Sequence, residues 1–359
     1  MLNDEMGSVS DVGLQMLNSS VSDEVTGILD LALAGKDISS DQAVVLLNAT
    51  GNDYNATLQV SDELRRRSVG DLVTFVVNRN INFTNVCIKR CGFCAFSRDF
   101  REEQGYFLPI NEIIRRSKEA WDYGATEVCI QAGLPPKMEG DLYVRLCEAI
   151  KEELPDIHIH GFSPEEVLYG SVRSNVSIRQ YLKDLKNAGV GSLPGTSAEI
   201  LDQKMRDEIS PGRITVDQWT EVITNAHDLD IPTTSTIMFG HVETNKHIAE
   251  HISYIRDIQK STGGFTEFVP LSFVNSEAPM FLKGLVQNVR TGPTGMDVMK
   301  VHAVARIMLN NWIPNIQASW VKEGDRMSQL LLHAGVNDLG GTLINESIST
   351  SAGAQHGQQ

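Results

Sequence analysis

The sequence predicts an α/β fold, a closed (β/α)8 barrel that follows a helical cap. Two observations carry this prediction. From Thr74 onward, short β-branched runs alternate with amphipathic segments, which is typical of βα units and a parallel sheet. Eight such runs occur, and eight strands with helices between them favour a closed barrel over a doubly wound sheet.

The chain divides into four predicted segments. Residues 1–20 are polar without strong periodicity, so we expect a loose N-terminal extension. Residues 21–70 form the predicted helical cap, in which Ser39 or Ser40 begins the second helix. The run Arg65-Arg66-Arg67 ends the last helical pattern, where its charge complements the carbonyl end of the helix. The barrel is predicted over 71–345 and a C-terminal tail over 346–359.

Strands and helices alternate through the predicted barrel. The predicted strands are Phe75–Asn82, Glu127–Gln131, Ile157–Gly161, Gly189–Leu193, Thr233–Phe239, Phe265–Leu271, Ile313–Ser319 and Val336–Leu339. The predicted helices between them include Asn111–Tyr123, Asp141–Glu153, Ile178–Ala188, Asp217–Asp230, Lys246–Lys260 and Asp297–Asn310.

Composition excludes several classes of protein. A formal net charge of -15 argues against binding to nucleic acid, which needs clustered Lys and Arg, and against an anionic membrane surface. No apolar run approaches the roughly 18 residues that cross a bilayer. The chain has 5 cysteines, an odd number, and no signal peptide at its start, which does not suit a disulfide framework. We therefore expect a cytoplasmic protein in a reducing compartment.

Three cysteines, Cys87, Cys91 and Cys94, follow the first predicted strand with CxxxCxxC spacing. Three thiolates can each hold one iron of a 4Fe-4S cluster and leave the fourth iron open to a small molecule. A structural zinc site or an ordinary ferredoxin cluster needs four ligands. A fourth ligand from Cys129, Cys147 or a distant histidine stays an alternative.

Polar residues follow several other strands, at the end of a barrel where active sites lie. These candidate site residues are Gln131, Ala132 and Gly133 after the second strand, Ser163 after the third, Glu199 after the fourth, His241 and Glu243 after the fifth, Gln317 at the seventh, and Asn337, Asp338 and Thr342 at the eighth.

Histidines are candidates for catalysis. His158 and His160 alternate on one strand, so they share a face, and His160 at the barrel mouth can touch substrate. No third metal ligand lies near them in the sequence, so a hydrogen-bonded interior pair is the alternative. His241 and Glu243 also share a face and suit proton transfer. Arg213 is expected at the surface, at the start of a helix.

Phe93, directly before the last cysteine, also fits the loop of radical S-adenosylmethionine (SAM) enzymes. From about Val21 to Gly357 the chain resembles one branch of that superfamily, which holds the subunits of FO synthase and the menaquinone-pathway enzymes aminofutalosine synthase and dehypoxanthine futalosine cyclase. The stretches that carry the resemblance are the cysteine loop with 76–85, His158-Ile-His-Gly-Phe-Ser-Pro-Glu-Glu, Gly195-Thr-Ser-Ala-Glu-Ile-Leu, Phe239-Gly-His-Val-Glu-Thr, Phe268-Val-Pro-Leu, Gln317-Ala-Ser-Trp-Val-Lys and Asn337-Asp-Leu-Gly-Gly-Thr-Leu-Ile-Asn-Glu-Ser.

The resemblance implies a TIM-type radical SAM barrel with one 4Fe-4S cluster on the three cysteines and bound SAM. If the chain binds SAM, their positions at the strand ends predict that Phe93, Gln131, Ala132, Gly133, Ser163 and Glu199 contact it, that His160, His241 and Glu243 are catalytic, and that Gln317, Asn337, Asp338 and Thr342 contact substrate. Within the branch, Gln131-Ala-Gly-Leu-Pro-Pro departs from the Gly-Leu-His-Pro of the menaquinone relatives and favours the tyrosine-using subunit of FO synthase.

The implied reaction splits the Cα–Cβ bond of L-tyrosine and adds the 4-hydroxybenzyl unit to 5-amino-6-(D-ribitylamino)uracil, in the synthesis of the deazaflavin FO. An external low-potential electron donor and the other FO synthase subunit are the implied partners. The alternatives are a futalosine-pathway radical SAM enzyme, a non-catalytic iron–sulfur carrier or scaffold, and a barrel stabilised by zinc. The polar strand ends count against a carrier, which needs no substrate cavity.

Overall fold

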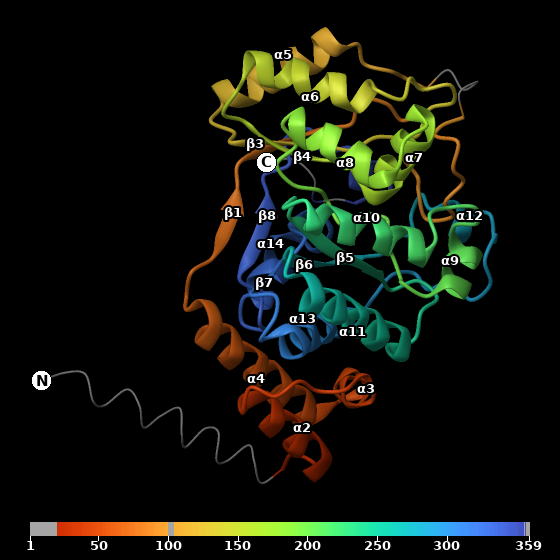
Figure 1. Cartoon of the computed structure of the whole chain (residues 1–359). Helices are drawn as coiled ribbons and strands as arrows, with labels where there is room; N and C mark the ends of the chain where they lie inside the picture. Colours follow the sequence, from red (N-terminus) through yellow and green to blue (C-terminus); the bar gives the residue numbers. More distant parts are fainter. Residues whose placement is uncertain (1–19, 100–103, 355, 357–359) are drawn as a thin grey trace, which may run out of the picture.

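The structure, a computed structural model, describes residues 20–99, 104–354 and 356 (Figure 1). Its strands are β1 (Thr74–Val76), β2 (Asn78–Ile81), β3 (Glu127–Ile130), β4 (His158–Gly161), β5 (Thr233–Phe239), β6 (Phe265–Ser272), β7 (Asn315–Ile316) and β8 (Asp338–Gly341). All strand pairs are parallel and form three sheets, β1-β8, β2-β3-β4 and β5-β6-β7.

Single bridges join the three sheets into a ring. Ser192 bridges to His160 of β4, and the next residue, Leu193, bridges to Thr233 of β5. Gln317, just after β7, bridges to Asp338 of β8. Since β1 and β2 are consecutive in the chain, the ring closes, and the predicted α/β barrel is confirmed.

Four predicted strands differ clearly from the observed ones. The seventh, predicted over Ile313–Ser319, is only Asn315–Ile316. The first divides at Val77, because β1 pairs with β8 whereas β2 pairs with β3. The predicted strand 189–193 makes only the two bridges of Ser192 and Leu193, consistent with the weak strand propensity of its two glycines. The last strand begins at Asp338 and ends at Gly341, two residues later than predicted, which changes the position of every residue on it.

Helices cover the outside of the barrel (Figure 1). The six predicted helices are observed with small shifts of their ends, as α5 (Ile110–Asp122), α6 (Leu142–Glu153), α8 (Ile178–Asn187), α10 (Val216–Asp228), α11 (Asn245–Thr262) and α13 (Gly295–Leu309). The barrel also has α7 (Pro164–Ser174), α9 (Gln203–Ile209), α12 (Pro279–Leu282), α14 (Trp320–Leu331) and α15 (Ile348–Ser351). None of the helices in the described ranges is both long and apolar enough to cross a membrane.

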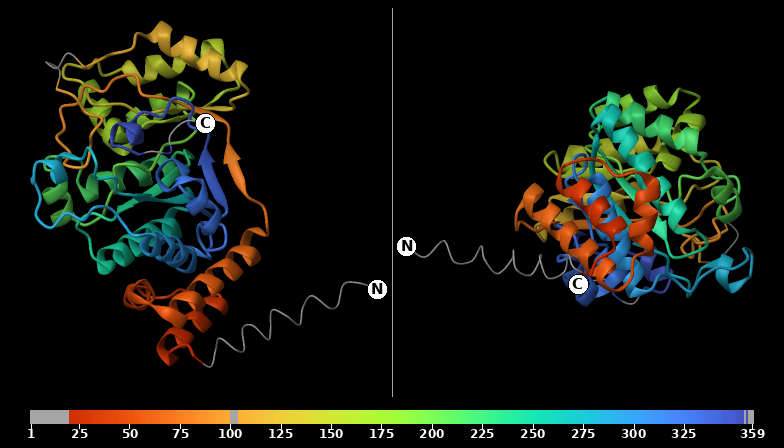
Figure 2. Two further views of the ribbon diagram at one scale, coloured as in Figure 1. Left: turned by 180° about the vertical axis from the view of Figure 1, so that it is seen from behind. Right: turned by 90° about the horizontal axis from the view of Figure 1, so that it is seen from below.

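Within the described residues, from Ser20 onward, three helices precede the barrel: α2 (Asp23–Leu33), α3 (Ser40–Asn48) and α4 (Gly51–Val69). Ser39 begins α3 through a capping box with Gln42. The left view in Figure 2 places the three helices at one end of the molecule, where α4 leads into β1. There α3 and α4 pack against α11 and α13. Apart from Ser20, the predicted extension lies outside the described residues, and the segment boundaries stay predictions.

The barrel interior is unusually polar. Two rows of side chains are in register on β2, β3 and β4: Asn78, Glu127 and His158 in a lower row near the amino ends, and Asn80, Cys129 and His160 in an upper row. Residues in register on parallel strands face the same side of the sheet, as do residues two apart. Since Asn80 and Cys129 line an internal cavity, both rows face inward.

Arg256 of α11 joins the N-terminal helices to the barrel. Its Nη1 donates to the Ile38 carbonyl at 2.8 Å, and the side chain is buried. We predict that Arg256→Met leaves this carbonyl unpaired and lowers the free energy of unfolding by about 1–3 kcal/mol. Urea unfolding measures the loss, and faster amide hydrogen exchange in α2–α4 locates it. Lys246→Met on the exposed face of α11 is the control, and equal losses in both variants would contradict the assignment.

Candidate active site

A cavity of about 370 Å³ lies at the carboxyl ends of the strands. Loops that follow several strands, from the first to the last, contribute to its wall. Ten predicted site residues line it: Cys87, Cys91, Phe93, Cys94, Gln131, Ala132, Gly133, Ser163, Glu199 and Gln317. A volume of this size suits small molecules rather than a macromolecule.

Backbone hydrogen bonds position the cysteine loop. The Ile88 N–H donates to the Leu134 carbonyl at 2.9 Å, and the Gly92 N–H donates to the Ile209 carbonyl at 2.8 Å. All three thiols are free and line the cavity. Burial raises the pKa of Cys91 to about 12, an effect that the charge of Arg213 opposes. Three thiols on one wall fit a cluster whose metal ions stabilise the thiolates.

The other two cysteines differ in position. Cys129 lines the cavity from β3, below the cysteine loop, while Cys147 is buried on α6 and does not line it. Burial raises the pKa of both thiols. Of the two cysteines considered as a fourth ligand, only Cys129 therefore shares the cavity with the loop.

Gly133 lets the turn after β3 approach the cysteine loop. A Cβ on Gly133 would lie 2.4 Å from the carbonyl oxygen of Val86, the residue before Cys87. Its N–H donates to the Thr84 carbonyl at 2.9 Å. The preceding Gln131 carbonyl accepts from Asn82 Nδ2 at 2.7 Å. The predicted Gln131-Ala132-Gly133 turn therefore fixes the start of the cysteine loop as well as lining the cavity.

Glu166, which the sequence did not single out, links two predicted residues. Its Oε1 accepts the Ala132 N–H at 2.9 Å, and its Oε2 accepts both the N–H and the hydroxyl of Ser163 at 2.8 and 2.6 Å. Burial raises the pKa of Glu166 to about 7, although these bonds act to lower it. Ser163-Pro-Glu-Glu166 is also the capping box of α7, a sequence signal that identifies this helix start.

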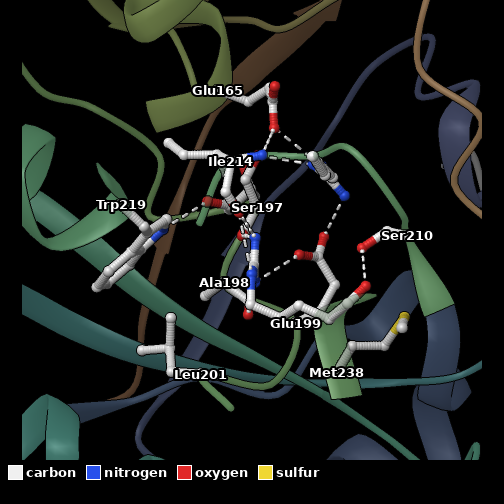
Figure 3. A network of polar contacts seen from close by, with 12 residues as sticks. Glu165, Ser197, Ala198, Glu199, Leu201, Ser210, Ile214, Trp219 and Met238 are labelled. Atoms are coloured by element: carbon white, nitrogen blue, oxygen red, sulfur yellow. Dashed lines mark hydrogen bonds and ion pairs between the residues drawn. The ribbon is translucent and has the colours of Figure 1, made fainter. Parts of the chain in front are cut away.

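Arg213 lines the cavity with its side chain only 14% exposed, so its expected surface position was wrong. Its Nη1 donates to Glu199 Oε1 at 2.7 Å, its Nη2 donates to the Ser197 hydroxyl at 2.7 Å, and its Nε lies 3.4 Å from Glu165 Oε2. The guanidinium also stands 5.4 Å from the ring centre of Phe93. Figure 3 shows this network, with Glu165 and Glu199 on opposite sides of it.

A second arginine holds the loop that carries Glu199. Arg206, fully buried on α9, donates to the carbonyls of Ser197, Ala198 and Ile214 at 2.6–2.9 Å. Ser197 and Glu199 have φ of 63° and 38°, a left-handed conformation that is unfavourable for side chains with a Cβ. Glu199 Oε2 is buried without a hydrogen bond in the structure. The loop thus presents Glu199 to the cavity in a fixed, strained shape.

The C-terminal segment also lines the cavity. Leu343, Glu346, Ile348, Ser349 and Ala352 all contribute. Burial lowers the pKa of Lys322, which lines the same cavity, and the charges of Glu346 and Glu323 oppose this effect. Glu346 Oε2 is buried and has no hydrogen-bond partner in the structure. Sequence reasoning missed both charged residues because neither directly follows a predicted strand.

The three predicted catalytic residues do not line the cavity. His160 Nδ1 lies 2.7 Å from the Ser192 hydroxyl, in the same row as Asn80 and Cys129, which line the cavity. His241 is fully buried, and its Nε2 pairs with the Met238 carbonyl at 3.0 Å. Glu243 accepts the N–H groups of Gly240 and His241 and pairs with Arg290. All three side chains are thus bound to other groups of the protein. Their catalytic role stays a prediction, and this geometry does not support it.

Three predicted substrate residues also lie outside the cavity. Asn337 Oδ1 accepts from buried Arg306 at 2.6 Å, the Thr342 hydroxyl donates to the Asn78 carbonyl at 2.9 Å, and Asp338 pairs with Thr74. The physical reason is the shifted strand: β8 begins at Asp338, which puts Asn337 and Asp338 at its amino end. Among the residues that follow β8, those that line the cavity begin at Leu343.

The fold and the cysteine-lined cavity define a radical SAM protein. Residues 81–255 match the Radical SAM superfamily, and residues 262–359 match the family described as CofH/MqnC C-terminal region. Two solved structures share the fold: methylornithine synthase, at 20% identity and a TM-score of 0.69 over 89% of this chain and 87% of that one, and the [FeFe]-hydrogenase maturase HydG, at 16% identity and a TM-score of 0.71 over 99% and 75%.

Curated relatives narrow the assignment. The chain is 48% identical over 325 residues to the 5-amino-6-(D-ribitylamino)uracil–L-tyrosine 4-hydroxyphenyl transferase of Methanocaldococcus jannaschii, covering 90% of this chain and 89% of that one. It is 47% identical over 320 residues to the protein of that name in Methanothermobacter thermautotrophicus, covering 89% and 86%. The FO synthase of Streptomyces avermitilis is 44% identical over 91% of this chain, which matches only 38% of that protein. The chain belongs to the family of these 4-hydroxyphenyl transferases within the radical SAM superfamily.

We predict that Gly133→Ala displaces the start of the cysteine loop, because its Cβ would collide with the Val86 carbonyl. After anaerobic reconstitution the variant should hold less than half of the iron and acid-labile sulfide of the unchanged protein. Gly27→Ala on α2, whose Cβ meets nothing within 4 Å, is the matched control. Full cluster content in Gly133→Ala would show that the loop does not depend on this contact.

The variant Asn337→Ala tests whether Asn337 contacts the substrate or stabilises the fold. Asn337→Ala removes the acceptor of Arg306 and should lower the free energy of unfolding by about 1–3 kcal/mol. Because the residue lies outside the cavity, we expect the KM values of the folded variant to stay within about twofold. Chemical unfolding and steady-state kinetics are the two measurements. A large rise in KM with unchanged stability would restore the predicted substrate role.

Proposed function

We propose that the protein is a radical SAM transferase that cleaves L-tyrosine and adds its 4-hydroxybenzyl group to 5-amino-6-(D-ribitylamino)uracil in the synthesis of the deazaflavin FO. One observation carries the proposal: three relatives named for this transfer are 47–48% identical over 89–93% of the chain. The cavity lined by Cys87, Cys91 and Cys94 supports it, since these thiols suit a radical SAM cluster.

The cofactors are assigned to the side of the cavity that carries the cysteine loop. Cys87, Cys91 and Cys94 hold the 4Fe-4S cluster, and SAM lies among the other predicted residues that line the cavity: Phe93, Gln131, Ala132, Gly133, Ser163 and Glu199. When bound, the cluster and SAM together supply the radical that abstracts hydrogen. The protein itself binds, orients and encloses the reactants, which limits the radical to the nearest bond.

Two separate sets of charged groups suit two amino-acid zwitterions. SAM and L-tyrosine each carry an α-ammonium and an α-carboxylate. Arg213 and Glu199, beside Phe93 of the cysteine loop, provide one pair of opposite charges. Lys322 and Glu346 line the cavity from the C-terminal part of the chain and provide another. We assign the first pair to SAM and the second to tyrosine.

Gln317 is the predicted substrate residue that the structure brings to the cavity. Its Nε2 donates to Glu267 Oε2 at 3.0 Å, so its side chain is held in place from below. A carboxamide can both donate and accept, which matches the alternating donors and acceptors of a uracil ring. We assign Gln317 to the uracil substrate.

Two partners complete the proposal. Radical SAM chemistry needs an external low-potential electron donor. The chain matches only 38% of the Streptomyces avermitilis FO synthase, so we propose that a separate subunit performs the remaining part of FO synthesis. The five free thiols suit a reducing compartment, and we assign the protein to the cytoplasm.

The test is an anaerobic incubation of reconstituted protein with SAM, L-tyrosine, the diaminouracil and a chemical reductant, analysed by mass spectrometry. We expect a 4-hydroxybenzyl adduct that depends on tyrosine. Cys91→Ala should lower its formation at least 1000-fold, because a cluster ligand is lost. Cys147→Ala, the same change on α6 outside the cavity, should keep at least half of the activity.

The same incubation separates the alternatives. SAM cleavage without a tyrosine-dependent adduct, together with turnover of a futalosine-pathway substrate, would favour the menaquinone relatives, and the match to the CofH/MqnC family makes them the second candidate. A cluster without any SAM cleavage would favour a carrier. Bound zinc without labile sulfide would favour a zinc-stabilised barrel.

A further inference from the structure

A second group of metal-ligand side chains lies at the amino end of the barrel, below the cavity. Glu127, His158 and His160 each offer a ligand atom, and these atoms all lie within 4.8 Å of one another. Glu127 is the first residue of β3 and is in register with His158, the first residue of β4. This pairing supplies the third ligand that the sequence around the two histidines lacks.

Neighbouring groups orient the three side chains. Asn78 Nδ2 donates to Glu127 Oε1 at 2.8 Å, which leaves Oε2 at 3.8 Å from His158 Nε2. His158 Nε2 and His160 Nδ1 each lie 2.7 Å from the same Ser192 hydroxyl. A hydroxyl has one proton, so it donates to only one of the two rings. The two ring nitrogens and the carboxylate oxygen therefore converge on one small region.

Gly191 makes room for this arrangement. A Cβ at this position would lie 2.4 Å from His158 Cε1 and 2.5 Å from its Nδ1. Any larger residue would therefore push the imidazole out of its position beside Ser192. The His158 side chain is 42% exposed, which leaves a path from solvent to the group.

The charge around the group favours a cation. Glu127, Glu267 and Asp338 interact electrostatically within the barrel, and burial with the charge of Asp338 raises the pKa of Glu267 to about 8. Among the residues that the structure describes, none of these three carboxylates forms an ion pair with a lysine or an arginine. A divalent ion held by Glu127 would reduce the repulsion among them.

We propose that Glu127, His158 and His160 bind one divalent transition-metal ion of the zinc class, with the Ser192 hydroxyl or water completing its coordination. Two imidazoles and one carboxylate are a donor set that zinc accepts. At about 3.3 Å per residue, Glu127 and His158 lie about 13 Å below Gln131, whereas His160, in register with cavity-lining Cys129, lies about 7 Å below it. The group is therefore below the cavity and apart from the cysteine loop.

The ion has a structural role, tying β3 to β4 and balancing the carboxylates, and it does not depend on the proposed reaction. The test titrates zinc chloride by calorimetry into anaerobic, cluster-loaded protein that has been passed over a chelating resin. X-ray absorption at the zinc edge then identifies the ligands. We expect one zinc per chain with nitrogen and oxygen neighbours alone.

Variants locate the ion. Glu127→Gln keeps the Asn78 hydrogen bond but loses the charge, and His158→Gln removes a half-exposed ring, so each should weaken zinc binding at least tenfold. His333→Gln, which removes an exposed histidine outside the group, should bind as the unchanged protein does. Absence of zinc binding in the unchanged protein, sulfur in the zinc ligand shell, or unchanged affinity in both Glu127→Gln and His158→Gln would overturn the proposal. The wild-type stoichiometry and ligand identity decide the question even when a variant folds poorly.

Discussion

The site depends on a close approach of two stretches of backbone, the turn after β3 and the start of the cysteine loop. Gly133 permits it, since a Cβ there would overlap the Val86 carbonyl, and the Ile88 and Gly133 N–H groups make hydrogen bonds across the contact. A loop without regular secondary structure has many conformations, and ordering it costs about 1–2 kcal/mol per residue. These bonds to the rigid barrel offset that cost, so the three thiols line the cavity from a fixed loop.

The same turn couples the cysteine loop to the next two strands. Glu166 accepts the Ala132 N–H and caps α7 through Ser163, while Gln131 Oε1 accepts from the Thr196 hydroxyl. Arg213 then joins the loop after the fourth strand position to Glu165 on α7. Each connection uses a buried charged or amide group with several partners, which makes the arrangement specific at the expense of desolvation. The predicted SAM residues thus form one connected wall.

The sequence was sufficient for the barrel and for one side of the cavity because strand alternation fixes which residues reach the carboxyl end. Register predicts that the cysteines, Gln131 and Ser163 lie at the carboxyl end of the barrel, and all of them line the cavity there, because the predicted ends of these strands are within one or two residues of the observed ends. The same reasoning fails where a strand end is misplaced, as for Asn337 and Asp338, because a two-residue shift moves a side chain by about 7 Å along the strand. His241 shows a further limit, since the turn at Gly240, with φ of 96°, takes it away from the cavity.

Strand register cannot identify charged site residues that come from loops and helices far along the chain. None of Arg213, Lys322 and Glu346 directly follows a predicted strand, and tertiary packing alone brings them to one cavity. Their position in the cavity gives these charges chemical weight, because a charge that is partly removed from water gains more from a ligand of opposite charge than an exposed charge does. Neither Glu199 Oε2 nor Glu346 Oε2 accepts a hydrogen bond in the described structure, although Glu199 Oε2 lies 3.5 Å from Arg206 Nη1. Each carboxylate can therefore gain a partner when an α-ammonium binds, which directs binding energy to holding the two reactants in one enclosed space.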